Sequence, residues 1–220
     1  MITIGIADSM IAQTEVADHL KNIYSEAGAR VEVILHPFNR LYYKNRQIGF
    51  RKYYKVLKDK YTDILIVKLT REGILNNVYK KIPLDVVIVT SDALTDTKGN
   101  NSKLYGHKII NSIGNYSYTI IPAAFENKAN LGKNKRQLIT YGMGRNAMVS
   151  ASSIDIDVEG YHLLQCCIKS AIETFQGKVI DEQEFAIKVA QKDVDITLAG
   201  IATLLIYGID CEHIFHQLGD

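Results

Sequence analysis

The chain has 220 residues, of which 47% are hydrophobic and 23% are charged, with 15 glycines and 3 prolines. This length accommodates one large domain or two small ones, and the composition excludes a collagen-like, low-complexity or disordered polymer. Because no segment approaches the roughly 18 uninterrupted apolar residues that cross a bilayer, we expect no membrane span.

The net charge of +2 combines two parts of opposite sign. Residues 1–154 contain 22 Lys and Arg against 12 Asp and Glu, whereas residues 155–220 contain 4 against 12. Opposite charges favour docking of the tail portion onto the body, or head-to-tail association of copies, although salt screens this attraction. A homo-oligomer or a protein partner is therefore an open expectation.

The start of the chain and its cysteines indicate a cytoplasmic location. Asp8 interrupts the first apolar stretch and no basic segment precedes it, which is unlike a signal peptide. The three cysteines include the adjacent pair Cys166 and Cys167, a pattern that does not suit a disulfide framework. A reducing compartment fits this usage better.

In chain order, the first segments predict a βαβ unit and a second helix. An apolar run covers 2–6, a helical stripe runs from 16 to 27 and stops at Gly28, and 30–36 alternates as a strand. A second helix is expected over 46–58, where Phe50, Tyr53, Tyr54 and Leu57 share one face and basic residues the other.

The middle of the chain continues the alternation of strands and helices. Continuous apolar runs predict buried strands at 62–69 and 85–90, which is typical of a parallel sheet covered on both faces. Helices are expected at 72–81 and 105–113, on either side of a polar stretch over 91–103. Strands are expected at 118–121 and 137–141, with polar residues between them.

The last third of the chain gives a less uniform pattern. The spacing of Leu164, Ile168, Ala171 and Phe175 favours a helix, although an extended ribbon over the same stretch stays open. A strand is expected at 184–189, then a helix at 194–205 closed by Gly208, and a final short helix after residue 210.

This order predicts an α/β fold with a doubly wound, mostly parallel sheet and helices on both faces. No Pro- or Gly-rich linker divides the sequence. We therefore expect a single domain over 1–220, in which 1–145 form the main α/β sheet and 146–220 add a smaller strand ribbon and the closing helices.

The order of segments also resembles the central domain of the Mur ligases, the ATP-dependent enzymes that add amino acids to the peptidoglycan precursor. The resemblance covers nearly the whole chain and is carried by segments 4–6, 27–31, 63–70, 84–91, 138–142 and 195–210. Among these, Leu-Ile-Thr-Tyr-Gly at 138–142 is similar to a strand of the family. The resemblance implies the Mur ligase fold, and it implies that 161–176 is strand, which we follow over the helical spacing.

The chain departs from the family where the family's ATP chemistry is located. The family's Gly-Lys-Thr/Ser loop cradles phosphate and holds magnesium, but the corresponding segment 5–14 has no lysine and carries Asp8, whose charge no neighbouring base offsets. The family's metal-binding glutamate falls at about Lys68, and its modified lysine has at best a loose counterpart in Lys103 or Lys108. Since the sequence stops at residue 220, we expect no third domain.

These observations predict a non-catalytic or cryptic Mur ligase-like domain that acts as a binding or regulatory module, linked to peptidoglycan precursor metabolism. No catalytic residue, metal site or cofactor is assigned, and ATP with magnesium is expected only if the altered loop still binds it. The alternative is a small-ligand or nucleotide-binding enzyme with a non-standard phosphate site beyond the strand ends. Its candidate ligand-binding residues are Asp8, Ser9, Thr70, Glu72, Asp92 and Asp96.

A basic and aromatic stretch over 40–60 suggests a third function. As a binding surface it would suit a phosphate-bearing partner such as nucleic acid, a nucleotide-sugar or anionic lipid. The structural interpretation, which we favour, is a solvated helix face whose aromatic stripe packs on the sheet. The candidate patch consists of Arg40, Lys44, Arg46, Arg51, Lys52 and Lys55.

Overall fold

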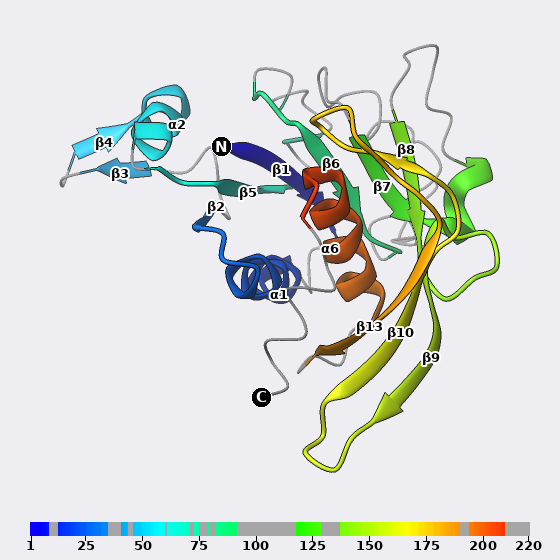
Figure 1. The fold of residues 1–220 in the computed structure, drawn as a ribbon. Coiled ribbons are helices and arrows are strands. Elements are labelled where there is room, and N and C mark those ends of the chain that lie inside the picture. The colour runs from blue at the N-terminus through cyan, green and yellow to red at the C-terminus, as the bar shows by residue number, and fades with distance from the viewer. Residues whose placement is uncertain are drawn as a thin grey trace, which may run out of the picture. The chain divides into compact units, whose positions relative to one another are not determined.

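The computed structural model describes residues 1–8, 13–34, 41–43, 46–59, 61–70, 73–74, 79, 82–91, 118–128, 137–189 and 194–209. Its contacts divide the chain into two compact units, Met1–Ser117 and Tyr118–Asp220 (Figure 1). We call them the N-terminal unit and the C-terminal unit. Strands alternate with helices in the N-terminal unit, and the C-terminal unit combines a run of strands with a 3₁₀ helix and an α-helix. Parallel strand pairs occur in both units, which confirms the predicted α/β class.

The N-terminal unit is built on parallel strands. Their order is β6 (Val86–Val89), β1 (Ile2–Ala7), β5 (Ile64–Leu69) and β2 (Val31–Ile34). Every residue of β5 and β6 is buried, as a parallel sheet covered on both faces requires. The apolar runs at 2–6, 62–69 and 85–90 are therefore the strands that the sequence predicts.

Helix α1 (Gln13–Glu26) follows β1 and packs against β2 and β5. It buries Val16, Leu20 and Ile23 along one side, as the helical spacing predicts. The helix ends at Gly28, which has a φ of 79° and donates its N–H to the carbonyl of Ser25 at 2.9 Å. This is the left-handed helix end that glycine adopts without strain.

Helix α2 (Phe50–Asp59) begins later than the sequence predicted. The expected helix over 46–58 is wrong for 46–48, because β4 (Arg46–Ile48) pairs with β3 (Leu41–Tyr43) in an antiparallel hairpin. The carbonyl of Gly49 accepts the N–H groups of Lys52 and Tyr53, so the first helical turn starts there.

Several expected elements fall wholly or mostly outside the described residues. Of the helix expected over 72–81, the structure describes Gly73 and Ile74, which are helical, and Tyr79, which is in a 3₁₀ turn. The helix expected at 105–113 and the final helix after residue 210 lie outside them.

The C-terminal unit combines parallel and antiparallel strands. Parallel β7 (Tyr118–Pro122) and β8 (Gln137–Tyr141) are separated in sequence by the 3₁₀ helix η2 (Ala123–Lys128). Strand β9 (Val149–Ile156) meets β8 only at Tyr141 and Val149, then pairs antiparallel with β10 (His162–Ile168), which pairs with β13 (Gln183–Val189). A small pair, β11 (Ile172–Glu173) and β12 (Val179–Ile180), completes the strands described.

The stretch 161–176 therefore contains the strands β10 and β11, as the resemblance implied, and the helix favoured by its spacing is wrong. Leu164, Cys166 and Ile168 alternate toward the core and are at most 2% exposed. A period of two coexists with the helical spacing in this segment, and the partners β9 and β13 on both sides decide between them.

Helix α6 (Val194–Tyr207) is buried over eleven consecutive residues, Ile196 to Ile206. It lies against β7, β8 and β9, and the carbonyl of Ile206 accepts the N–H of Phe175 at 2.9 Å. Gly208, with a φ of 77°, ends it as the sequence predicts. Among the residues described, no helix is both long and apolar enough to cross a membrane.

Candidate functional site

The candidate site lies in the N-terminal unit, at the carboxyl ends of β5, β1 and β6. Ala7 pairs with Leu69 on one side and Val89 on the other, so the next residues along the three strands are Thr70, Asp8 and Thr90. The N–H of Thr90 continues the ladder by donating to the carbonyl of Ala7 at 3.0 Å. Open α/β sheets bind their ligands beyond this edge.

Asp8 is buried at the end of the central strand of this group. Its exposed fraction is 4%, and Thr90, which is 2% exposed, donates its hydroxyl hydrogen bond to Asp8 Oδ1. Burying a carboxylate is costly unless hydrogen bonds and opposite charge compensate it. The local structure therefore needs a cation near Asp8.

Lys68 supplies that cation from β5. It pairs with Ile6, so the two side chains lie on the same face of the sheet, and Asp8 follows Ile6 by two residues on that face. Lys68 is 8% exposed. Burial lowers the pKa of Lys68, and the negative charge of Asp8 opposes this lowering. The Asp8 carboxylate thus favours the charged form of Lys68.

Thr70 is held by a second set of polar contacts. The Tyr79 hydroxyl accepts the N–H of Thr70 at 2.6 Å, lies 3.1 Å from Thr70 Oγ1 and donates to the carbonyl of Lys68 at 3.3 Å. Thr70 Oγ1 also accepts the N–H of Gly73 at 3.2 Å. Burial raises the pKa of Tyr79. These bonds use the polar atoms of Thr70 to fix the chain that leaves β5.

The structure brings two of the predicted ligand-binding residues, Asp8 and Thr70, to one edge. The other four lie outside the described residues: Ser9, Glu72, Asp92 and Asp96. Sequence reasoning missed Thr90 as a site residue, although it is the first residue after an apolar run, as Asp8 is. The expectation that no base offsets Asp8 was wrong, because Lys68 comes from the neighbouring strand.

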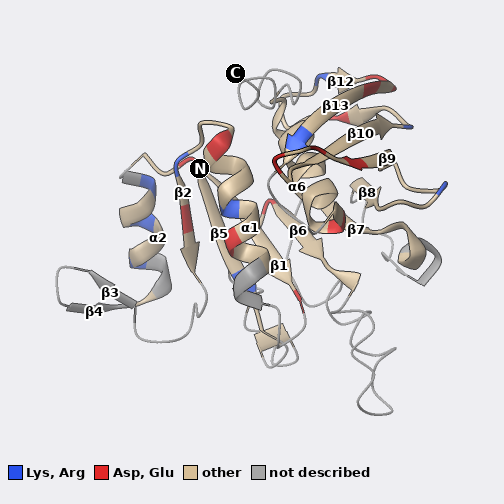
Figure 2. Cartoon of the chain, turned by 90° about the horizontal axis from the view of Figure 1, so that it is seen from below, with Lys and Arg blue, Asp and Glu red and all other residues tan. Residues whose placement is uncertain are grey.

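Of the predicted basic patch, Arg46 lies on β4, and Arg51, Lys52 and Lys55 lie on α2, whereas Arg40 and Lys44 fall outside the described residues. Lys52 and Lys55 are exposed, and blue segments of the α2 ribbon mark its basic residues in Figure 2. On the other side of the helix, Leu57 is buried.

Fold and site together define an α/β domain with a polar edge at the carboxyl ends of its parallel strands. Within the described residues, no group of three or more His, Cys, Asp and Glu side chains is placed to hold a metal ion. The edge holds two buried side chains of opposite charge, Asp8 and Lys68, on neighbouring strands.

Comparison with known proteins identifies the fold. No protein-family model and no curated protein matches the sequence. Among solved structures, a UDP-N-acetylmuramoylalanyl-D-glutamyl-2,6-diaminopimelate–D-alanyl-D-alanyl ligase from Acinetobacter baumannii matches 99% of this chain and 45% of its own, with 15% identity and a TM-score of 0.62. A UDP-N-acetylmuramoyl-L-alanyl-D-glutamate–2,6-diaminopimelate ligase matches 98% of this chain and 45% of its own, with 12% identity and a TM-score of 0.61.

A second group of enzymes has the same fold. The bifunctional folylpolyglutamate synthase/dihydrofolate synthase from Yersinia pestis, solved with AMPPNP and a manganese ion, matches 99% of this chain and 56% of its own, with 16% identity and a TM-score of 0.56. The chain thus has the fold of the central region of Mur ligases and folylpolyglutamate synthases. It spans about half the length of the structures it matches.

The described residues at the edge do not fit the metal nucleotide that this fold implies. Magnesium takes oxygen ligands, and here the ammonium group of Lys68 lies in the field of the Asp8 carboxylate. A triphosphate is held by N–H donors and cations, and here a buried carboxylate follows the first strand. Residues 9–12 of the altered loop lie outside the described part of the chain, so the described residues test only one side of this fit.

Proposed function

We propose that this chain is a binding or regulatory module with a Mur ligase-like fold, and that it does not carry out ATP-dependent ligation. The observation that supports the proposal is the buried pair of Asp8 and Lys68 at the carboxyl ends of β1 and β5. By the resemblance, the family's metal-binding glutamate falls at about Lys68, so an ammonium group stands there in place of a carboxylate. Asp8 adds a negative charge at the edge where the family binds phosphate, and like charges repel more strongly in low-dielectric surroundings.

Nucleotide binding to the full chain tests this proposal. Isothermal titration with ATP and MgCl₂ is expected to give no saturable heat, and thermal unfolding no ligand-dependent rise in Tm. Lys68→Met serves as the site variant, and Lys58→Met, at an exposed lysine of α2, as its matched control. Saturable micromolar binding that Lys68→Met weakens and Lys58→Met leaves unchanged would overturn the proposal.

We propose further that this module acts in the cytoplasm on peptidoglycan precursors. Two of the similar structures are ligases whose names specify UDP-N-acetylmuramoyl peptides, and the thiols of Cys166 and Cys167 are free, in keeping with a reducing compartment. Titration with UDP-N-acetylmuramoyl-L-alanyl-D-glutamate is expected to stabilise the chain more than UDP-N-acetylglucosamine does. Equal or absent stabilisation contradicts this link.

A small-ligand enzyme is the second candidate, and the surroundings of Lys68 favour it. A buried lysine whose pKa is lowered, beside a carboxylate, is an arrangement found in proton-transfer sites. Acetylation of lysines as a function of pH, followed by mass spectrometry, tests whether Lys68 reaches solvent as a neutral amine. Modification of Lys68 at a lower pH than Lys58 supports this candidate, and protection at every pH excludes it.

A further inference from the structure

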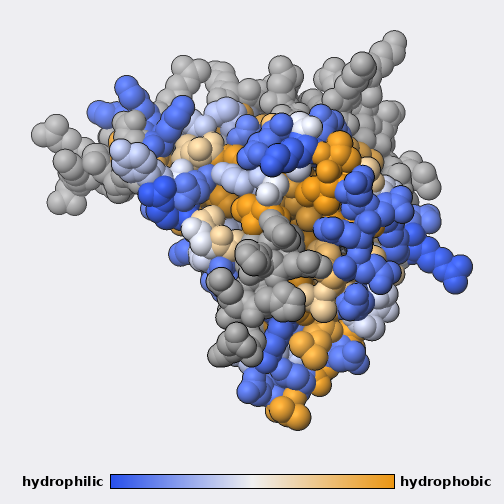
Figure 3. Space-filling model, in the orientation of Figure 1, coloured by the Kyte–Doolittle hydropathy of each residue, from blue (hydrophilic) through white to orange (hydrophobic). Residues whose placement is uncertain are grey.

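The end of the β9–β10 hairpin exposes several large apolar side chains. We call residues 154–163 the hairpin apex. The exposed fractions there are 39% for Ile154, 67% for Ile156, 104% for Val158, 38% for Tyr161 and 40% for Leu163. At the lower end of the hairpin in Figure 3, hydrophobic and hydrophilic surfaces lie next to each other. The strand register puts Ile154 and Ile156 on one face of the hairpin and Leu163, which pairs with Asp155, on the other, with Val158 in the turn between the strands. Exposed apolar area of this kind marks interaction surfaces when it is contiguous, as it is from Ile156 to the turn.

The turn of the apex is closed by hydrogen bonds. Asp157 Oδ1 accepts the N–H groups of Glu159 and Tyr161, both at 2.9 Å, and the backbone N–H of Asp157 donates to the carbonyl of Tyr161 at 2.9 Å. Gly160, with a φ of 86°, completes the turn. The backbone on both sides of Val158 is therefore fixed while its side chain stays in solvent.

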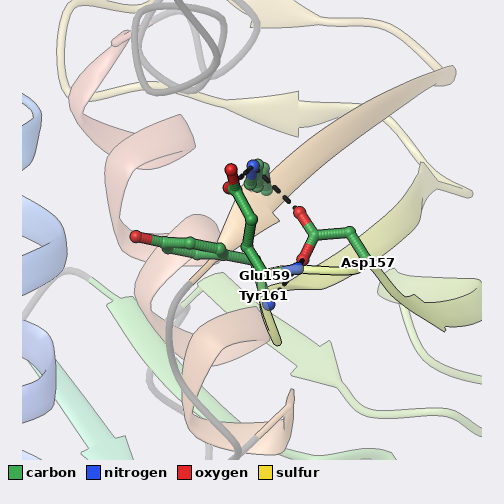
Figure 4. A network of polar contacts seen from close by, with 4 residues as sticks. Asp157, Glu159 and Tyr161 are labelled. Carbon is green, nitrogen blue, oxygen red and sulfur yellow. Dashed lines mark hydrogen bonds and ion pairs between the residues drawn. The ribbon is translucent and has the colours of Figure 1, made fainter.

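Lys188, on β13, forms ion pairs with Asp157 and Glu159 of the hairpin apex. Its Nζ lies 2.9 Å from Asp157 Oδ2 and 3.0 Å from Glu159 Oε2, and 4.5 Å from the centre of the Tyr161 ring (Figure 4). A surface ordered before binding loses less conformational entropy when a partner docks. The polar contacts thus present an apolar apex in a preformed shape.

Charge indicates the kind of partner. Asp155 and Glu159 are exposed at the apex, and residues 155–220 as a whole carry 4 Lys and Arg against 12 Asp and Glu. A partner for this surface needs basic groups next to apolar area. Helix α2 has both, because Lys52, Lys55 and Lys58 are exposed beside the half-buried rings of Tyr53 and Tyr54.

We propose that the hairpin apex of one copy of this chain docks on α2 of a second copy. The lysine ammonium groups would pair with the acidic rim, while their methylene stems and the tyrosine rings would cover Val158 and Ile156. Because the two surfaces differ, each copy offers one apex and one α2 surface, and every contact joins the apex of one copy to α2 of another.

Sedimentation velocity of the full chain tests the proposal. We expect concentration-dependent association at about 50 mM NaCl that falls steeply at about 500 mM NaCl, since salt screens the charged rim. Val158→Asp and the pair Lys52→Glu with Lys55→Glu should each weaken association by about tenfold or more. Val179→Asp, at an apolar residue of β12 that is 59% exposed, is the matched control and should leave association unchanged.

A mixture of the Val158→Asp protein and the Lys52→Glu, Lys55→Glu protein tests the proposed contact more directly. A copy with an intact apex and a copy with an intact α2 retain one productive contact between them, so the mixture should form a dimer and nothing larger. Unchanged thermal unfolding of each variant alone shows that the chains remain folded. Monomers at every concentration, or association that both changes leave intact, would each overturn the proposal.

Discussion

Asp8 and Lys68 lie buried at the carboxyl ends of adjacent strands, so the loss of either leaves the other charge without its compensation. Asp8→Asn and Lys68→Met should each destabilise the fold, by about 1–3 kcal/mol, because each leaves a buried polar group with less compensation. The double variant should lose less than the sum, with a coupling of about 1 kcal/mol or more. Urea unfolding of the four proteins measures this coupling, and additive losses would show that the charges act independently.

A second charged pair, at the start of β5, gives a prediction for acid. Bonds from the Arg30 side chain and its backbone N–H lower the pKa of Asp63 from 3.8 to about 2. In the unfolded chain the pKa returns to its ordinary value, so the stabilisation is complete above about pH 4 and is lost as the pH falls toward 2. The urea midpoints of the wild-type protein and of the Asp63→Asn variant should therefore converge as the pH falls toward 2.

The size of this effect is limited by solvent, because the side chains of Arg30 and Asp63 are 62% and 39% exposed. High salt should reduce the difference between the two proteins at pH 6. A difference in midpoint that stays constant from pH 6 to pH 2 would contradict the assignment.

At the scale of elements, the segment that leaves β5 depends on a glycine. A Cβ on Gly73 would lie 2.5 Å from the Tyr79 ring, whose hydroxyl bonds to Thr70. Gly73→Ala should therefore displace Tyr79 and destabilise the fold by about 1–3 kcal/mol. Gly144→Ala, where nothing lies within 4 Å, is the control. Equal urea midpoints for the two variants would show that this packing contributes little.

The elements that the sequence predicts well are those with one dominant signal. The apolar runs of β5 and β6 and the Gly28 end of α1 leave few alternatives. The pattern fails at 46–48, because a short hairpin precedes α2 and three residues carry too little periodicity to separate the two structures. It also fails at 161–168, where the partners of β10 come from distant parts of the chain.

For the candidate site too, the sequence predicts what local patterns determine and misses what depends on distant parts of the chain. Asp8 and Thr70 are visible in the sequence as polar residues that follow apolar runs. The compensation of Asp8 by Lys68 is not visible there, because sixty residues separate them and the strand register of β1 and β5 brings them together. To predict a site that strand pairing brings together, one must know which strands are neighbours and in which register, and local sequence patterns do not give this.

At the scale of the whole molecule, the fold is kept while the sequence is not. The matched structures share 12–16% identity with this chain and cover 98–99% of it. Apolar burial tolerates exchange among Val, Ile and Leu, whereas a phosphate or metal site depends on individual charges. A lysine and an aspartate at the strand ends can therefore change what the edge binds without changing the sheet.

The single domain expected over 1–220 leads to a prediction about unfolding. No Pro- or Gly-rich linker separates Met1–Ser117 from Tyr118–Asp220, and we propose that both unfold in one transition. Leu205→Ala, at a fully buried position of α6, should lower the free energy of unfolding by about 2–5 kcal/mol. Hydrogen exchange should then show the same loss of protection in β5 as in α6. Unchanged protection in β5 would mean that the two units are separate domains.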